Sequence, residues 1–138
     1  MTDCILRVRG PSVDVDSFLA GTTLQADQVW HKGEKTRRRF ADTSGFSVLV
    51  SSSKDDSLAE QMEGAIQFLT ANRETLRRLS EDPTLEAGLD FARHRHDPLP
   101  IAEYDRFSRS MVSAAADCGL FLELSHYMVQ EDDDDAGA

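Results

Sequence analysis

The segment that begins at His94 carries the side chains best suited to chemistry. On a β-strand, residues two apart point to the same face, so His94 and His96 can approach one metal ion, with Asp90 on that face as an oxygen ligand. Two imidazoles do not complete a zinc site, and a third histidine ligand could come only from His31 or His126, if the fold brings one of them close. The alternative interpretation is a solvated strand end that leads into a proline-containing loop. The sequence therefore leaves two hypotheses for this segment: a metal site of Asp90, His94 and His96, or a solvated strand end.

A basic segment with aromatic neighbours is the second candidate. Its members are Trp30, Lys32, Lys35, Arg37, Arg38, Arg39 and Phe40. Arginine pairs with oxyanions through two parallel hydrogen bonds, so this segment could bind a phosphate, an acidic protein or a nucleic-acid backbone. Strand alternation sends Arg37 and Arg39 to one face and Arg38 to the other, however, so the cations do not form a single surface. The alternative is an edge hairpin whose charges prevent edge-to-edge pairing.

Trp30 is the only tryptophan in the chain. Aromatic side chains dominate the energetics of protein interfaces, although a packed position is the more common environment for a tryptophan. One hypothesis is therefore that Trp30, Arg37 and Arg39 bind a partner. The other is that all three have structural roles.

Motifs of the common enzyme classes are absent from the sequence. There is no GxGxxG or GxxxxGK[ST] loop for a nucleotide phosphate, no GxSxG turn and no HExxH helix. Cys118 ends an apolar helical stripe and has no neighbouring base in the sequence that would activate its thiol. We therefore predict no cofactor. Enzymatic activity is less favoured than binding, because only a site assembled from distant residues would leave no motif.

Composition indicates one globular domain with a packed core. The chain has 138 residues, of which 40% are hydrophobic and 29% charged. Its 25 acidic and 15 basic side chains give a net charge of −10, which opposes nucleic-acid binding. Half of this excess lies in the acidic block at residues 131–135. We predict a single α+β domain over residues 1–130 and an acidic disordered tail over residues 131–138.

The sequence contains no apparent membrane-spanning segment or secretory signal peptide. No apolar run approaches the roughly 18 residues of a membrane span, and the first residues do not resemble a signal peptide. Cys4 and Cys118 both lie in apolar patterns and are expected to be core residues rather than a disulfide. We therefore expect a cytoplasmic protein without a membrane partner.

Hydrophobic periodicity predicts the elements. Alternating apolar residues predict strands over residues 3–9, 84–94 and 120–124, and a continuous apolar run predicts a strand over residues 46–51. A turn at residues 32–34 predicts a hairpin whose strands cover residues 27–31 and 36–40. Helical spacing predicts helices over residues 14–20, 58–79 and 103–118. Ser57, followed by Glu60, fits a capping box at the start of the second helix. The order predicts an α+β fold: a mixed, mainly antiparallel sheet with helices on one face, in which a ferredoxin-like βαββαβ core carries an extra helix and strand.

The segment Val29, Trp30, His31, Lys32 and Gly33 resembles a bacterial family known as domain-of-unknown-function family 4279. The similarity covers about residues 3–129: an opening strand, a short helix, a tryptophan and lysine-glycine turn, a long helix and a leucine-rich closing strand. The resemblance implies no activity, cofactor or catalytic residue. It implies only that Trp30 and Gly33 shape the hairpin.

The distribution of residues favours a binding function. Nearly every apolar residue has a structural explanation, and the polar residues show no convergent chemistry. We therefore expect a non-enzymatic protein that presents a sheet face or edge to another protein, or to a second copy in a homodimer. Its acidic charge suits an immunity-type or accessory role toward a basic partner. The rival hypothesis is a small-molecule or metal-binding protein that uses the face of Asp90, His94 and His96.

Overall fold

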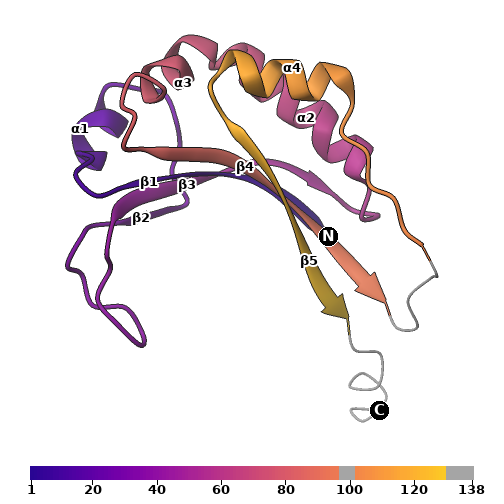
Figure 1. Ribbon diagram of the computed structural model, residues 1–138, viewed down its shortest axis with the longest axis horizontal. Helices are drawn as coiled ribbons and strands as arrows, with labels where there is room; N and C mark the ends of the chain where they lie inside the picture. Colours follow the sequence, from indigo (N-terminus) through magenta and orange to yellow (C-terminus); the bar gives the residue numbers. More distant parts are fainter. Residues whose placement is uncertain (97–101, 130–138) are drawn as a thin grey trace.

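A computed structural model describes residues 1–96 and 102–129 of the chain (Figure 1). The elements follow in the order β1 (Thr2–Gly10), α1 (Val15–Ala20), β2 (Gln28–Trp30), β3 (Ser44–Ser53), α2 (Leu58–Ala71), α3 (Arg73–Leu79), β4 (Glu86–His96), α4 (Arg109–Asp117) and β5 (Phe121–Val129). The acidic tail predicted for residues 131–138 lies outside the described residues.

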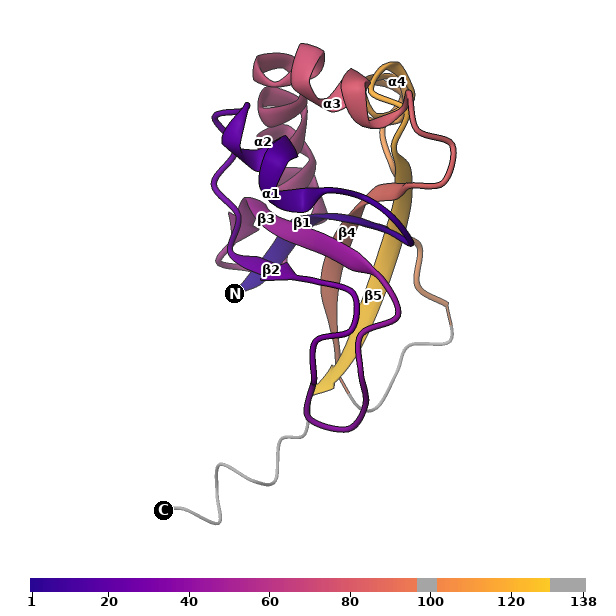
Figure 2. The same cartoon turned by 90° about the vertical axis from the view of Figure 1, so that its left-hand side faces the viewer.

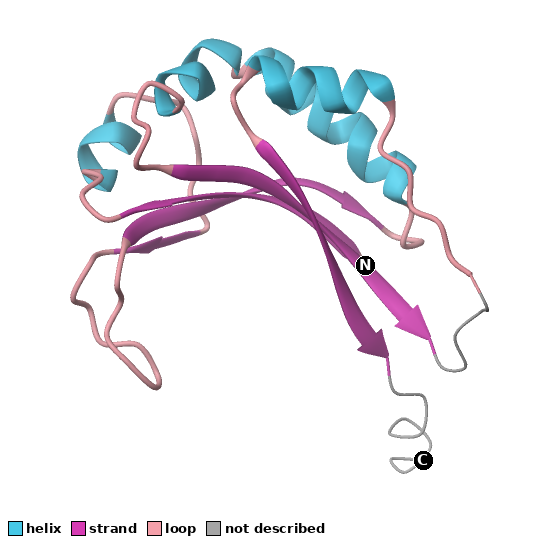
Figure 3. Ribbon diagram, in the orientation of Figure 1, coloured by secondary structure: helices cyan, strands magenta, loops and turns pink. Residues whose placement is uncertain are grey.

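The five strands form one sheet in the order β2-β3-β1-β4-β5. All neighbouring strands are antiparallel except β4 and β5, which are parallel and joined by α4. The helices lie on one face of the sheet, and the sheet bends so that its other face is on the inside of the curve (Figures 1 and 3). The predicted α+β class, with a mixed sheet covered by helices on one face, is confirmed.

Strand alternation decides which side chains reach the core. Cys4, Leu6 and Val8 on β1 point toward the helices and are fully buried, whereas Arg7 and Arg9 between them point to the other face. Register continues the pattern across the sheet, because Leu6 of β1 pairs with a buried valine of β3 and a buried leucine of β4. Helices α2 and α4 cover this layer with their own apolar stripes.

The long helix predicted over residues 58–79 is interrupted. Helix α2 begins at the predicted N-cap, where the Ser57 hydroxyl accepts a hydrogen bond from the backbone N–H of Glu60 at 3.2 Å. It ends at Asn72, whose side-chain amide donates to the carbonyl of Phe68 at 2.9 Å. An asparagine side chain that bonds to the backbone competes with helix continuation, so α3 starts after it. Periodicity alone did not reveal this break.

The last helix starts later than predicted. Residues 102–108 are not helical, and α4 begins only after Ser108, whose hydroxyl accepts from the backbone N–H of Met111 at 3.1 Å. This serine supplies the N-cap, because its side chain satisfies a first-turn N–H that has no partner within the helix. The strand predicted over residues 120–124 continues as β5 to Val129.

The predicted hairpin between residues 27–31 and 36–40 is wrong. The antiparallel partner of β2 is β3, so residues 31–43 form a long loop between these two strands, here called the 31–43 loop. Within it, the backbone N–H and the hydroxyl of Thr36 both donate to the carbonyl of Arg39, which closes a tight turn. Only one isolated bridge, between Lys35 and Phe40, remains of the predicted basic strand. None of the described helices is long and apolar enough to cross a membrane.

Candidate functional site

The helix-free face of the sheet is the candidate site. Figure 2 shows the helices layered on one side of the sheet, with the 31–43 loop extending on the other side. Three large apolar side chains are about half exposed here: Leu49 of β3 at 48%, Phe121 of β5 at 47% and Tyr127 of β5 at 52%. The register places them on this face, because Leu49 pairs with Ile5 of β1 and strand alternation sets Tyr127 on the same side as Phe121. The face therefore combines exposed apolar groups with charged neighbours.

Ion pairs between neighbouring strands cross the centre of this face. Arg7 of β1 donates to the carboxylate of Asp90 on β4 at 2.5 Å, and the Ser125 hydroxyl of β5 donates to the same carboxylate at 2.5 Å. Asp90 is buried, with only 3% of its surface exposed, so its charge depends on these two donors. Two residues further along β1, Arg9 donates to Glu86 of β4 at 2.8 Å, but both of these side chains are exposed.

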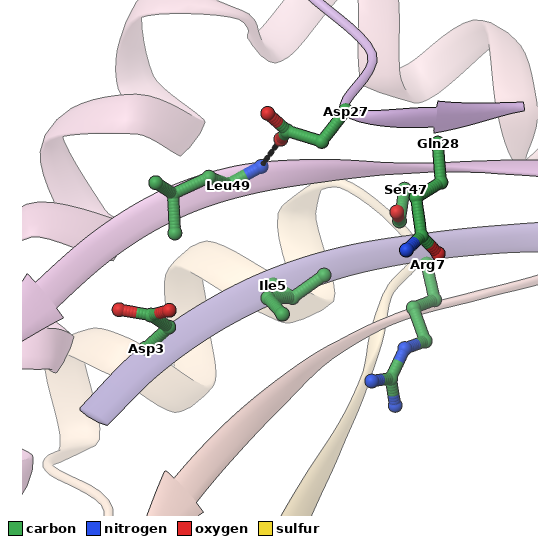
Figure 4. Close-up of a pocket in the computed structure, with 7 residues that line it drawn as sticks. All are labelled: Asp3, Ile5, Arg7, Asp27, Gln28, Ser47 and Leu49. Atoms are coloured by element: carbon green, nitrogen blue, oxygen red, sulfur yellow. Dashed lines mark hydrogen bonds between the residues drawn. The ribbon is translucent and has the colours of Figure 1, made fainter. Parts of the chain in front are cut away.

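A pocket of about 280 Å³ lies beside these ion pairs, over β1, β3 and the start of β2 (Figure 4). Ile5 and Leu49 form its apolar floor. The carboxylate of Asp27 accepts from the backbone N–H of Leu49 at 2.5 Å, and Asp3 accepts from the Ser52 hydroxyl at 2.8 Å. Figure 4 shows that the Arg7 side chain extends away from the floor, over β4. The pocket thus has an apolar centre and carboxylates held on two sides.

Two of the three predicted partner-binding residues meet in a second pocket. Trp30 and Arg39 line a cavity of about 400 Å³ together with Arg9. The indole of Trp30 lies over Gly45, where a Cβ atom would approach the ring to 2.5 Å, and its N–H donates to Thr43 at 3.4 Å. Gly33 has a φ of 91°, a conformation that glycine adopts without strain. Arg37, by contrast, is exposed near the tip of the 31–43 loop and does not line this cavity.

The residues of the predicted metal site lie along β4. Asp90 and His94 are four residues apart on one strand, which is a rise of roughly 13 Å. Both oxygens of the Asp90 carboxylate already have partners, Arg7 and Ser125. Among the residues that the structure describes, no group of three His, Cys, Asp or Glu residues is placed to hold a metal ion. The site of Asp90, His94 and His96 stays a prediction, and the described geometry adds no further ligand to it.

The two other histidines also lie apart from His94. The register pairs His126 with Arg93 and His94 with Tyr127, so His126 and His94 point to opposite faces of the sheet. The Nδ1 atom of His126 accepts a hydrogen bond from Arg95 at 2.9 Å. His31, at the end of β2, uses both ring nitrogens for carboxylates, with Nδ1 at 2.5 Å from Glu34 and Nε2 at 2.8 Å from Asp16.

His31 is expected to stay protonated above its ordinary pH range. The hydrogen bonds that the ring donates to Glu34 and then to Asp16 raise the pKa of His31 above its usual 6.5. Its contribution to stability is fully present below the unfolded pKa and is lost as pH rises through the higher folded pKa. A titration followed by NMR of the imidazole should give a midpoint above 6.5 in the native protein. The substitution Glu34→Gln should return the midpoint toward the ordinary value, and an unchanged midpoint would show that the contact does not persist in solution.

A partly buried charge cluster lies on the helix side of β4. Arg93 donates through Nε to Asp56 at 3.1 Å and through Nη1 to Asp105. The exposed fractions of the side chains of Arg93, Asp56 and Asp105 are 17%, 25% and 11%. Partial burial raises the pKa of Asp56, but the backbone N–H of His94 and the hydrogen bond and charge of Arg93 outweigh it, so the pKa lies below its usual value. The cluster ties β4 to the loop before α2 and to the segment before α4.

Both cysteines are free and buried, as their apolar sequence patterns predicted. Burial raises the pKa of the Cys4 thiol, and the nearby charge of Asp90 raises it further. Burial also raises the pKa of the Cys118 thiol. A thiol with a raised pKa is a poor nucleophile at neutral pH, so the described structure gives neither cysteine a catalytic environment.

Sequence reasoning missed the central ion pair and the first pocket. Arg7 and Asp90 are 83 positions apart, so only the strand order brings them together. The alternation of charged and apolar residues on the first and fourth strands was a usable signal, because it marked Arg7 and Asp90 as facing away from the helices. Asp27 carried no such signal, because it precedes β2 and its carboxylate accepts from the backbone of β3.

Comparisons with protein-family models, curated proteins and solved structures find no match to this chain. The function is therefore inferred from the geometry of the helix-free face.

Proposed function

We propose that this chain is a protein-binding module whose contact surface is the helix-free face of the sheet. The observation that carries the proposal is the exposure of Leu49, Phe121 and Tyr127 on a face that none of the described helices covers. Apolar side chains exposed among charged neighbours on one face are typical of protein interfaces. Arg7, Asp90 and Ser125 hold the middle of this face rigid, which lowers the entropy lost on binding.

The outer edge of β5 extends this surface. β5 pairs with β4 on one side, and in the described part of the chain no strand pairs with its other side. Its nine residues contain no lysine, arginine or proline, which are the usual protection of an edge strand against pairing. A partner strand can therefore add to β5 through main-chain hydrogen bonds. A second copy of this chain is the alternative occupant, because two identical edges related by a twofold axis complement each other.

We also propose a ferredoxin-like core, membership in family 4279 and a cytoplasmic location for this chain. A ferredoxin-like core is supported by the order β2-β3-β1-β4 with antiparallel neighbours, to which α4 and β5 are appended. Membership in family 4279 is supported by the packed Trp30 and the positive φ of Gly33 in the turn that carries the resemblance. A cytoplasmic location is supported by the two free thiols.

A pair of matched substitutions tests the binding face. Leu49 on the helix-free face and Val112 on α4 are equally exposed, at 48% and 49%, and lie on opposite sides of the protein. Leu49→Lys should abolish stable binding of the native partner in affinity purification, because a charge inside an apolar contact costs several kcal/mol. Val112→Lys should retain the partner. Equal retention by both variants would contradict the proposal, and recovery of a second copy of the chain would assign this face to a homodimer.

A further inference from the structure

The pocket beside Arg7 has an uncompensated negative charge. Asp3 and Asp27 accept hydrogen bonds from uncharged donors, a hydroxyl and a backbone N–H, which fix the carboxylates but leave their charge. No ion pair within residues 1–96 and 102–129 involves either of them. The nearest cation, Arg7, is neutralised by the buried Asp90. The pocket therefore presents two fixed negative charges beside an apolar floor.

We propose that this pocket binds one lysine or arginine side chain of the partner protein. The inference rests on the proposed function and names the chemistry that the helix-free face recognises. Lysine and arginine have an apolar stem and a charged end, so the stem would lie on Ile5 and Leu49 while the cation lies between Asp3 and Asp27. A volume of about 280 Å³ is at the small end of ligand pockets and suits a single side chain. The net charge of −10 favours encounter with a basic partner, and the carboxylates of Asp3 and Asp27 would attract its cation locally.

Capped single amino acids serve as probes for this pocket. The ¹⁵N-labelled full chain is titrated with Nα-acetyl-arginine amide, Nα-acetyl-lysine amide, the uncharged norleucine analogue and the glutamate analogue. The cationic probes should give saturable shifts at the backbone amides of Ile5, Gln28 and Leu49, and the binding should weaken as salt is added. The norleucine probe should bind about tenfold more weakly, because it shares the stem but lacks the charge. Equal binding of the norleucine and arginine probes would overturn the inference.

Isosteric variants test whether Asp3 and Asp27 are the residues that bind the cation. The double substitution Asp3→Asn with Asp27→Asn keeps an oxygen acceptor for Ser52 and for the Leu49 N–H but removes both charges. The double variant should bind the arginine probe with an affinity about tenfold lower than that of the native protein. Asp42→Asn is the control, because Asp42 is exposed and lies outside this pocket, and it should leave binding unchanged. Unchanged binding in the double variant, with a native-like spectrum, would overturn the inference.

The inference and the proposed function can fail separately. If the arginine probe does not bind but Leu49→Lys still abolishes partner retention, the face binds a partner by other chemistry and the cation pocket is overturned. If the arginine probe binds as described but Leu49→Lys retains the partner, the pocket stands and the proposed binding face is wrong.

Discussion

Replacing Arg93 with methionine is expected to lower the free energy of unfolding by about 3–5 kcal/mol. The substitution keeps much of the aliphatic stem but leaves the carboxylates of Asp56 and Asp105 facing each other in a mostly buried site. An uncompensated buried charge is the costly part, because neither carboxylate retains a cation in the described part of the chain. Urea unfolding followed by circular dichroism measures the difference.

The pH dependence separates this effect from lost packing. The pKa of Asp56 in the folded protein is depressed, so its contribution to stability is present above the unfolded pKa and is lost as pH falls through the folded pKa. The deficit of Arg93→Met should therefore shrink in acid, because protonation removes the repulsion. Arg95→Met is the control: Arg95 bonds to His126 rather than to a carboxylate, so it should cost about 1 kcal/mol or less. A deficit that is constant with pH would indicate lost packing instead.

Replacing Arg7 with methionine is expected to cost about 2–3 kcal/mol, because it leaves the buried Asp90 carboxylate with only the Ser125 hydroxyl. The half exposure of Arg7, at 47%, keeps this cost below that of Arg93. Adding Asp90→Asn to the Arg7→Met variant should recover part of the loss, since an amide is cheaper to bury than an unpaired charge.

The neighbouring exposed pair provides a matched control for Arg7. Arg9→Met removes an arginine from the same face of the same strand, but its partner Glu86 is 60% exposed. Its cost should be at most about 0.5 kcal/mol, as for most surface ion pairs. Equal costs for Arg7→Met and Arg9→Met in the same urea experiment would show that Asp90 does not depend on Arg7.

Local patterns predicted the layers of the fold. The alternation of Cys4, Leu6 and Val8 with arginines identified the buried face of β1, and Ala87, Leu89 and Phe91 did the same for β4. Interruptions escaped prediction, because Asn72 ends α2 through a side-chain bond to the backbone that hydrophobic spacing does not report. The prediction of a basic strand over residues 36–40 was wrong for a similar reason, because Thr36 and Arg39 close a turn through hydrogen bonds that apolar spacing does not report.

The candidate site could be predicted only in part. Trp30 and Arg39 were selected by residue type, and the structure brings them to one cavity. The pocket of Ile5, Leu49 and the two carboxylates needs the sheet order, because β1 and β3 are separated in sequence by α1 and β2. No pattern in the sequence marked Arg93, because its partners Asp56 and Asp105 come from two distant loops.

The helix-free face of the sheet is expected to contact the partner directly. Hydroxyl-radical footprinting of the purified native complex, read by mass spectrometry, tests it at the level of side chains. Leu49, Phe121 and Tyr127 should be protected from oxidation in the complex, whereas Val112 and the highly exposed Tyr104 should react as in the free protein. Protection at Val112 with unchanged oxidation of Leu49 and Phe121 would place the interface on the helices and contradict the account.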